Sequence, residues 1–168
     1  MIIREITGDD TARFYQMTCR LDEETQYMMF EPGERQAKAG DLNRLRERIE
    51  AASGADFVRA AIDDDGEIVG YIWAERRKLN RVRHTAYIVV GIRRAWRRQG
   101  IGTAFFRLLD DWARANGVVR LELTVECAND AAKRLYEKHG FRVEGVRSKS
   151  MRVEGRLVDE YYMAKIME

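Results

Sequence analysis

TAYIVVGIRRAWRRQGIGT, residues 85–103, decides the fold, because it joins a strand, a turn and the start of a helix. Its first half is apolar without interruption from Tyr87 to Val90, which predicts a strand in the centre of a sheet, with neither face toward water. Its second half carries Gly100 and Gly102 ahead of apolar residues at helical spacing. A strand, a glycine-rich turn and a helix predict an anion site, because the first amide groups of a helix lack intrahelical partners and carry partial positive charge.

The turn suits two linked phosphates. Gly100 and Gly102 allow a pyrophosphate to approach the backbone, and Arg97 and Arg98 add positive charge at the rim. A dinucleotide fingerprint would need Gly or Ala where Phe105 stands, and a P-loop would need Gly-Lys-Ser/Thr. The alternative is that the glycines only start a helix and that the arginines are a solvated run.

Elements on both sides of this stretch predict a mixed α/β fold. Before it we expect a strand over 2–6, a helix near 10–20, a charged helix ending near Gly54, and an antiparallel hairpin of strands 56–62 and 67–76. The central strand covers 83–92. After it we expect a helix over 100–116, a strand over 118–125, a helix from Asn129 to Lys138, and a closing hairpin, 141–151 with 157–166, turning at Glu154-Gly155. The prediction is a mostly antiparallel sheet of about seven strands with about four helices.

Composition predicts one domain over residues 1–168. The chain is 45% apolar, and its 30 Lys and Arg against 28 Asp and Glu leave a net charge of only +2, which argues against a polycation that coats nucleic acid. Cys19 and Cys127 have no metal-site spacing, so we expect no metal, no disulfide and a reduced, cytoplasmic protein. We expect the N-terminus to be neither a signal peptide nor a membrane span, and we expect no membrane partner.

Two motifs resemble the GNAT superfamily of N-acetyltransferases. Arg97-x-x-Gly100-x-Gly102 matches its Arg/Gln-x-x-Gly-x-Gly/Ala signature after a strand, and residues 129–141 are similar to its Asn-x-x-Ala-x-x-x-Tyr-x-x-x-Gly-Phe segment. The resemblance is strong over about residues 56–166, whereas the first 55 agree only in strand, helix, helix order. It implies a GNAT-like fold and an acyltransferase that moves the acetyl group of acetyl-CoA to a primary amine by direct attack, without a covalent enzyme intermediate.

The resemblance also implies roles for individual residues. Backbone of Val90, Gly91 and Ile92 would pair with the pantetheine arm and stabilise the oxyanion, and Tyr136 would donate a proton to the departing thiolate. Asn129 would bind pantetheine or cap its own helix, and Tyr136 could instead only pack its helix on the sheet. The residues expected to hold the pyrophosphate are Arg97, Arg98, Gln99, Gly100, Ile101, Gly102 and Thr103.

The base and the acceptor stay open. Many relatives carry Glu on the strand before the turn, but residues 85–90 contain no carboxylate. The candidates are Glu126 and Glu122, which share one face of their strand with Thr124, and Glu31 in the loop after the first helix. Residues 27–35 would form one wall of the acceptor site, and the nearby Glu23, Glu24, Glu31 and Glu34 could attract a cationic amine such as a polyamine, an amino acid or a protein amine. A homodimer is left open.

Two other functions compete with this interpretation. A noncatalytic acetyl-CoA-binding regulatory module would share the fold and would explain the missing strand carboxylate. A nucleic-acid-binding module would use Arg93, Arg94, Arg97 and Arg98 with Trp96 between them, but the balanced charge of the whole chain argues against it.

Overall fold

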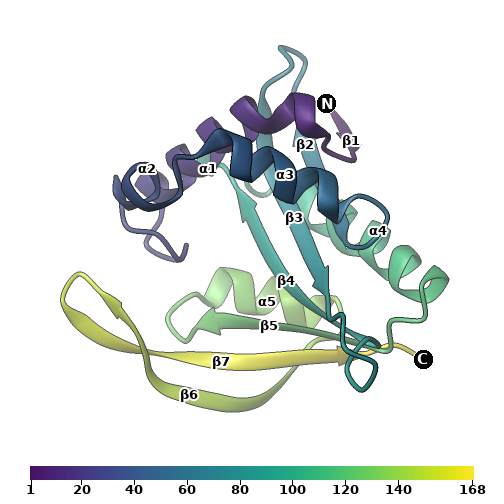
Figure 1. The fold of residues 1–168 in the computed structure, drawn as a ribbon. Helices are drawn as coiled ribbons and strands as arrows, with labels where there is room; N and C mark the ends of the chain where they lie inside the picture. Colours follow the sequence, from purple (N-terminus) through teal and green to yellow (C-terminus); the bar gives the residue numbers. More distant parts are fainter. The chain divides into compact units, whose positions relative to one another are not determined.

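The computed structural model describes all 168 residues and contains seven strands and five α-helices (Figure 1). Two short 3₁₀ helices, η1 and η2, precede α1 and α4. The elements in chain order are β1 (Ile2–Arg4), η1 (Gly8–Asp10), α1 (Thr11–Glu24), α2 (Glu34–Ala39), α3 (Leu42–Ala52), β2 (Phe57–Ile62), β3 (Ile68–Arg76), β4 (Thr85–Ile92), η2 (Arg94–Trp96), α4 (Ile101–Ala115), β5 (Arg120–Glu126), α5 (Asp130–Lys138), β6 (Arg142–Val153) and β7 (Arg156–Ile166).

The strands form one mixed sheet in the order β1-β2-β3-β4-β5-β7-β6. The pairs β1–β2, β2–β3, β5–β7 and β6–β7 are antiparallel, and β4 pairs with β5 in parallel at Thr85–Tyr87. The central place of β4 confirms the prediction from its apolar run. The expectation that neither face of β4 meets water is wrong at Val89, which is 40% exposed.

Internal contacts divide the chain into two compact units, here called the first unit, residues 1–75 and 89–105, and the second unit, residues 76–88 and 106–168. Strand β4 and helix α4 each contribute residues to both units. The prediction of one domain over 1–168 stays a prediction.

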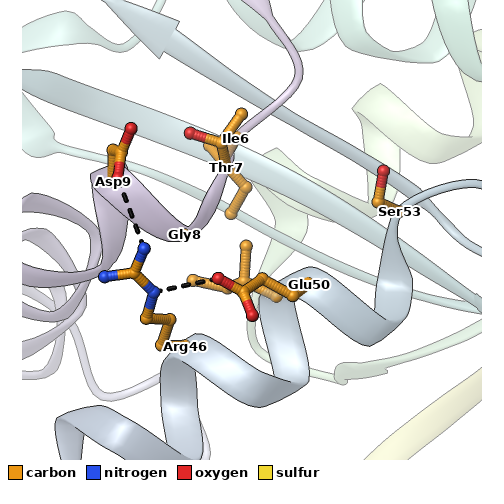
Figure 2. Close-up of a pocket in the computed structure, with 8 residues that line it drawn as sticks. Ile6, Thr7, Gly8, Asp9, Arg46, Glu50 and Ser53 are labelled. Atoms are coloured by element: carbon orange, nitrogen blue, oxygen red, sulfur yellow. Dashed lines mark hydrogen bonds and ion pairs between the residues drawn. The ribbon is translucent and has the colours of Figure 1, made fainter.

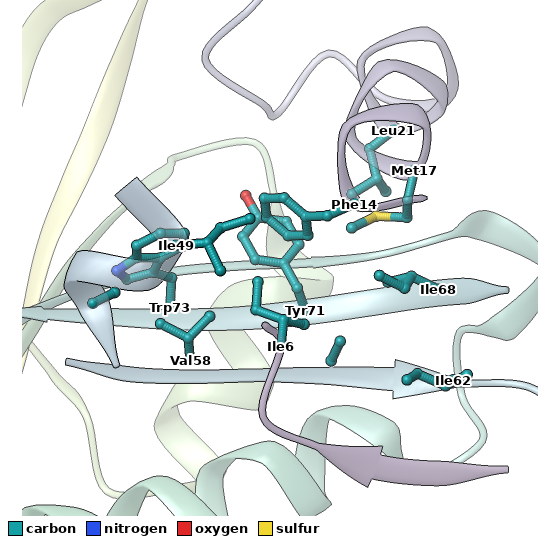
Figure 3. Packing of buried hydrophobic residues seen from close by; sticks show 12 residues of the cluster. Ile6, Phe14, Met17, Leu21, Ile49, Val58, Ile62, Ile68, Tyr71 and Trp73 are labelled. Carbon is teal, nitrogen blue, oxygen red and sulfur yellow. The ribbon is translucent and has the colours of Figure 1, made fainter. Parts of the chain in front are cut away.

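The core of the first unit lies between helices α1 and α3 and strands β2 and β3 (Figure 3). Phe14 of α1 stands edge-on to Tyr71 of β3, with ring centroids 5.1 Å apart, and lies 6.4 Å from Trp73. Helix α3 adds Ile49, and β2 adds Val58. These side chains fill one face of the hairpin, which explains why α1 and α3 are amphipathic.

The charged segment predicted as one helix is two helices in the structure. Gly40 ends α2, and Asp41 begins α3 by accepting hydrogen bonds from the amides of Asn43 (3.0 Å) and Arg44 (3.2 Å). A β-carbon on Gly40 would come 2.6 Å from the carbonyl oxygen of Gln36, so the close turn requires glycine. The count of five helices instead of about four follows from this break.

In the second unit, α4 and α5 contact each other through the rings of Phe106 and Tyr136, whose centroids lie 5.7 Å apart. The fully buried side chains of this unit include Phe106 and Leu109 of α4, Leu121 and Leu123 of β5, and Met163 of β7. Glu154 (φ 48°) and Gly155 (φ 79°) form the turn of the β6–β7 hairpin, as the sequence predicts.

Candidate active site

The turn between β4 and α4 leaves its main-chain donors unused. Arg98 and Gly100 have left-handed backbones, with φ of 61° and 83°. Ala104 N donates to Gly100 O at 3.0 Å, but the structure records no main-chain hydrogen bond donated by residues 98–103. Left-handed residues beside a helix N-terminus form the concave set of amides that binds anions. The turn can therefore bind a diphosphate without first breaking internal bonds.

Side chains of the turn are exposed, and two of them brace its own backbone. Arg97 Nε donates to Ile92 O at 3.0 Å, and Gln99 Nε2 donates to Ala95 O at 3.0 Å. A β-carbon on Gly100 would meet no atom within 4 Å, so within the protein alone this glycine is required by its positive φ. Ile101, the first residue of α4, is buried, unlike the residues of the turn before it.

Gly91, in the strand segment expected to hold pantetheine, lies under the end of α1. A β-carbon there would come 2.7 Å from Leu21 Cδ1, 3.1 Å from Tyr71 Cε1 and 3.6 Å from Met28 Cε. Met28 belongs to the segment 27–35 expected to form the acceptor wall. In the first unit, the strand segment expected to hold pantetheine therefore lies close to Met28 of the expected acceptor wall, and a larger residue at position 91 would displace the Leu21 side chain.

An ion pair holds this wall in place. Arg35 donates to both carboxylate oxygens of Asp22, at 2.6 and 3.0 Å, and its guanidinium lies 4.4 Å from the centre of the Phe30 ring. Asp22 is 2% exposed, so the pair is shielded from water. The residues between α1 and α2 are thus fixed from both ends.

The acidic residues around the expected acceptor wall differ in whether they are free to attract a cationic amine. Glu24 binds Arg93 (2.7 Å), and Glu34 binds Lys38 (2.6 Å) and the amide of Glu31 (3.0 Å). The side chains of Glu23 and Glu31 are exposed. Glu24 and Glu34 are therefore engaged within the chain and are poor candidates for attracting an amine.

In the second unit, Tyr136 of α5 is 8% exposed and lies in an aromatic cluster. Its ring centroid is 5.7 Å from that of Phe106 and 6.1 Å from that of Phe141. His139 joins the cluster by stacking on Phe106 at 5.1 Å. The packing that the sequence offered as an alternative role is therefore present, and it fixes the direction of the Tyr136 ring.

Asn129 caps α5 in the structure. Its Oδ1 accepts a hydrogen bond from Ala132 N at 3.2 Å. This is the capping role that the sequence allowed, and it occupies the carbonyl end of the side chain.

The carboxylates of β5 occupy two different environments. Glu122 accepts a hydrogen bond from Arg120 Nε at 2.9 Å, and burial together with a hydrogen bond to Glu122 raises the pKa of the Tyr162 phenol. Glu126 is 6% exposed and lies opposite Glu160, which is 5% exposed, in the β5–β7 register. Glu122 is thus tied to a cation, whereas Glu126 shares its surroundings with a second carboxylate.

One residue of interest, Glu160, was missed from the sequence. It could have been found, because Glu160 and Tyr162 alternate on β7 opposite Glu126 and Thr124 of β5. Glu24 was named only as a possible attractor of an amine, and its contacts with Arg93 and Arg94 could not be predicted because these partners lie 69 and 70 residues away in the chain.

The remaining reactive side chains do not form a site. Burial lowers the pKa of His139, the residue that follows α5. Burial raises the pKa of the Cys127 thiol. His, Cys, Asp and Glu side chains nowhere form a group of three that could hold a metal ion.

A hollow on the first unit is lined by none of the predicted site residues (Figure 2). Arg46 crosses it, donating to Glu50 Oε1 at 2.9 Å and reaching Asp9 Oδ1 at 3.4 Å. Because its charged groups pair with one another, we assign no ligand to it. The residues that line the hollow are Ile6, Thr7, Gly8, Asp9, Arg46, Ile49, Glu50 and Ser53.

Among the helices, none combines the length and the apolar character that crossing a membrane requires.

Comparison with known proteins assigns the chain to a class that fits its fold and its glycine-rich turn. Residues 15–141 match the model of the acetyltransferase (GNAT) family, so the chain belongs to the GNAT family and is an acyltransferase that carries out N-acetyl transfer. The mixed, mostly antiparallel sheet expected from the resemblance is confirmed as the GNAT fold.

Particular relatives sharpen this assignment. The chain is 32% identical over 125 residues to the L-amino acid N-acetyltransferase AaaT of Escherichia coli (strain K12), covering 72% of this chain and 74% of that protein. It matches the structure of a GNAT-family acetyltransferase from Streptococcus pneumoniae with a TM-score of 0.92 and 26% identity over 99% of both chains. The YncA protein of Salmonella typhimurium, a putative acetyltransferase solved with its cofactor acetyl-CoA, matches with a TM-score of 0.85 and 22% identity over 100% of this chain and 94% of that one.

Proposed function

We propose that the protein transfers the acetyl group of acetyl-CoA to the amino group of a free L-amino acid or a closely similar small primary amine. The family supports N-acetyl transfer, and the 32% identity with an L-amino acid N-acetyltransferase supports this class of acceptor over a polyamine or a protein amine. The observation that carries the proposal is the turn before α4, whose main-chain donors from residue 98 to 103 have no recorded partner.

The donor would be held by two sets of residues. Amides of residues 98–103 would bind the pyrophosphate, with the exposed guanidinium groups of Arg97 and Arg98 adding a salt-dependent contribution. Val90, Gly91 and Ile92 would pair with the pantetheine arm through their backbone, and the side-chain amide of Asn129 would donate to it while its oxygen caps α5. The exposure of Val89 supports access of a ligand to this part of β4.

The reaction would be a direct attack of the neutral amine on the thioester carbonyl. A carbon–nitrogen bond forms, the carbon–sulfur bond breaks, the amine loses a proton to a base, and the departing thiolate takes a proton from Tyr136. A backbone amide between Val90 and Ile92 would stabilise the oxyanion that forms in between. The chain's contribution is to position the two substrates and to move these two protons.

Glu126 is a stronger candidate for the base than Glu31. It is 6% exposed, whereas Glu31 lies in an exposed part of the wall where bulk water competes for any proton. The paired test is turnover in Glu126→Gln and Glu31→Gln. We expect a loss of about 100-fold in the first, in the range of general-base catalysis, and less than about twofold in the second. The reverse order would assign the role to Glu31.

Calorimetry and product analysis test the proposal as a whole. We expect acetyl-CoA to bind the folded protein at moderate salt, and a panel of L-amino acids, polyamines and peptides to release free CoA fastest with an amino acid, whose acetylated product mass spectrometry identifies. Absence of acetyl-CoA binding would rule out the donor site. Binding without CoA release for any amine would instead favour a regulatory module, and faster release with polyamines or peptides would overturn the acceptor class.

A further inference from the structure

We propose that Glu24 is a positioning residue for the donor turn: it clamps the chain where β4 leaves the sheet, and thereby sets the affinity for the diphosphate of acetyl-CoA. This inference rests on the proposed function of the turn. Glu24 is the last residue of α1 and lies outside the two motifs that resemble the family signature.

The clamp uses every acceptor that Glu24 has. One carboxylate oxygen accepts from Arg93 Nε at 2.7 Å, and the other accepts from the main-chain amide of Arg94 at 2.7 Å. The main-chain oxygen of Glu24 accepts from Arg94 Nη2. Two successive residues are thus held by one side chain, immediately before η2.

Other contacts complete the fixation of this segment. The amide of Arg93 donates to Val69 O of β3 at 2.9 Å, so Arg93 is held by the sheet on one side and by α1 on the other. Arg97 Nε then ties the chain back to Ile92 O at 3.0 Å. The chain is therefore fixed from residue 92 to residue 97, directly before the amides that have no recorded partners.

The pair is shielded enough to act as a structural contact. The side chains of Arg93 and Glu24 are 23% and 21% exposed. Burial alone would raise the pKa of the Glu24 carboxyl, but the hydrogen bonds from the Arg94 amide and from Arg93 outweigh it and hold the pKa below its ordinary value. Glu24 is therefore ionised at neutral pH, and its charge-assisted hydrogen bonds are of the stronger kind.

Positioning and plain electrostatics make opposite predictions for this residue. Glu24 places a negative charge beside three arginines, at positions 93, 94 and 97. If only charge mattered, its removal would strengthen the binding of an anionic donor. If Glu24 positions the turn, its removal weakens binding although the site becomes more positive.

The experiment measures the affinity of Glu24→Ala and of the isosteric Glu24→Gln for CoA by calorimetry. We expect CoA to bind about tenfold more weakly to both variants, the loss typical of a broken charge-assisted network. Acetyl-pantetheine, which lacks the diphosphate, should bind both variants as it binds the wild type. The KM for acetyl-CoA should rise by a similar factor, while kcat and the KM for the amine change less than about twofold.

Glu23→Ala is the matched control, because Glu23 is the exposed neighbour on the same helix. It should leave CoA affinity unchanged. Unchanged or tighter CoA binding in the Glu24 variants would overturn the inference, and so would an equal loss for acetyl-pantetheine, which would indicate general damage to the fold. Failure of the wild type to bind CoA would instead overturn the proposed function itself.

Discussion

The two motifs that mark this chain as a GNAT protein are used differently by its fold. In the turn over residues 97–103, the main-chain donors have no recorded partners from Arg98 onward. In the segment from Asn129 to Phe141, motif residues make contacts within the protein: Asn129 caps α5, and Tyr136 packs against Phe106 and Phe141. Because the second motif already has a structural role, its part in the reaction must be separated from stability, so each motif needs a different kind of test.

The largest effect is expected where the motif serves only the ligand. Gly102 is buried in the first turn of α4, and Gly102→Arg should place a long side chain among the donor amides. We expect the affinity for acetyl-CoA, measured by calorimetry, to fall by more than about 100-fold, equivalent to about 3 kcal/mol.

Gly145→Arg is the matched control for this substitution. Gly145 lies on β6, where an added β-carbon meets no atom within 4 Å. It should bind acetyl-CoA as the wild type does. Retained affinity in a folded Gly102→Arg protein would show that the diphosphate binds elsewhere.

Tyr136 tests whether a packed motif residue also takes part in the chemistry. Tyr136→Phe keeps the ring in the cluster with Phe106 and Phe141 and removes only the phenol. We expect kcat to fall about 100-fold, as for loss of a general acid, while the affinity for acetyl-CoA changes less than about twofold. The measurement is steady-state turnover across pH together with calorimetry.

Tyr15→Phe makes the same chemical change in α1, away from both motifs, and should leave kcat unchanged. If kcat of Tyr136→Phe equals that of the wild type at every pH, the tyrosine serves packing alone.

Asn129 should show a smaller effect that divides between stability and binding. Asn129→Ala removes the cap of α5 and should lower the free energy of unfolding by about 1 kcal/mol. It should also weaken acetyl-CoA binding about fivefold, because the side-chain amide would lose one neutral hydrogen bond to pantetheine. Chemical denaturation and calorimetry measure the two parts.

Asp41→Ala is the control that separates them, because Asp41 caps α3 in the same way, through the amides of Asn43 and Arg44. It should cost similar stability and leave binding unchanged. If Asn129→Ala binds acetyl-CoA as tightly as the wild type does, Asn129 serves only as the cap of α5.

The contrast between the motifs also explains what the sequence could predict. Local patterns predicted every strand, because alternation and turn residues such as Glu154-Gly155 act within a few positions. They joined α2 and α3 into one helix, because the break at Gly40 depends on a close approach to the Gln36 carbonyl that composition does not reveal. Contacts between distant segments, such as Glu24 with Arg93 and Arg94, have no local pattern and became visible only in the folded chain.

The smallest expected effect comes from His139, which closes the Asn129–Phe141 segment by stacking on Phe106. Burial lowers its pKa, with Lys165, Lys138 and Arg107 acting in the same direction and Asp110 opposing them. The folded protein therefore binds the proton less tightly than the unfolded chain, whose histidine titrates near about 6.5. The contribution of the neutral imidazole to stability is complete above that pH and is lost as the pH falls toward the lower pKa of the folded state.

Denaturation of the wild type and of His139→Gln between about pH 7.5 and 5 measures this contribution, and we expect the wild type to lose more stability on acidification than the variant does. Parallel curves for the two proteins would mean that the imidazole keeps its ordinary pKa, and that the aromatic cluster around Tyr136 is more open to water than its packing indicates.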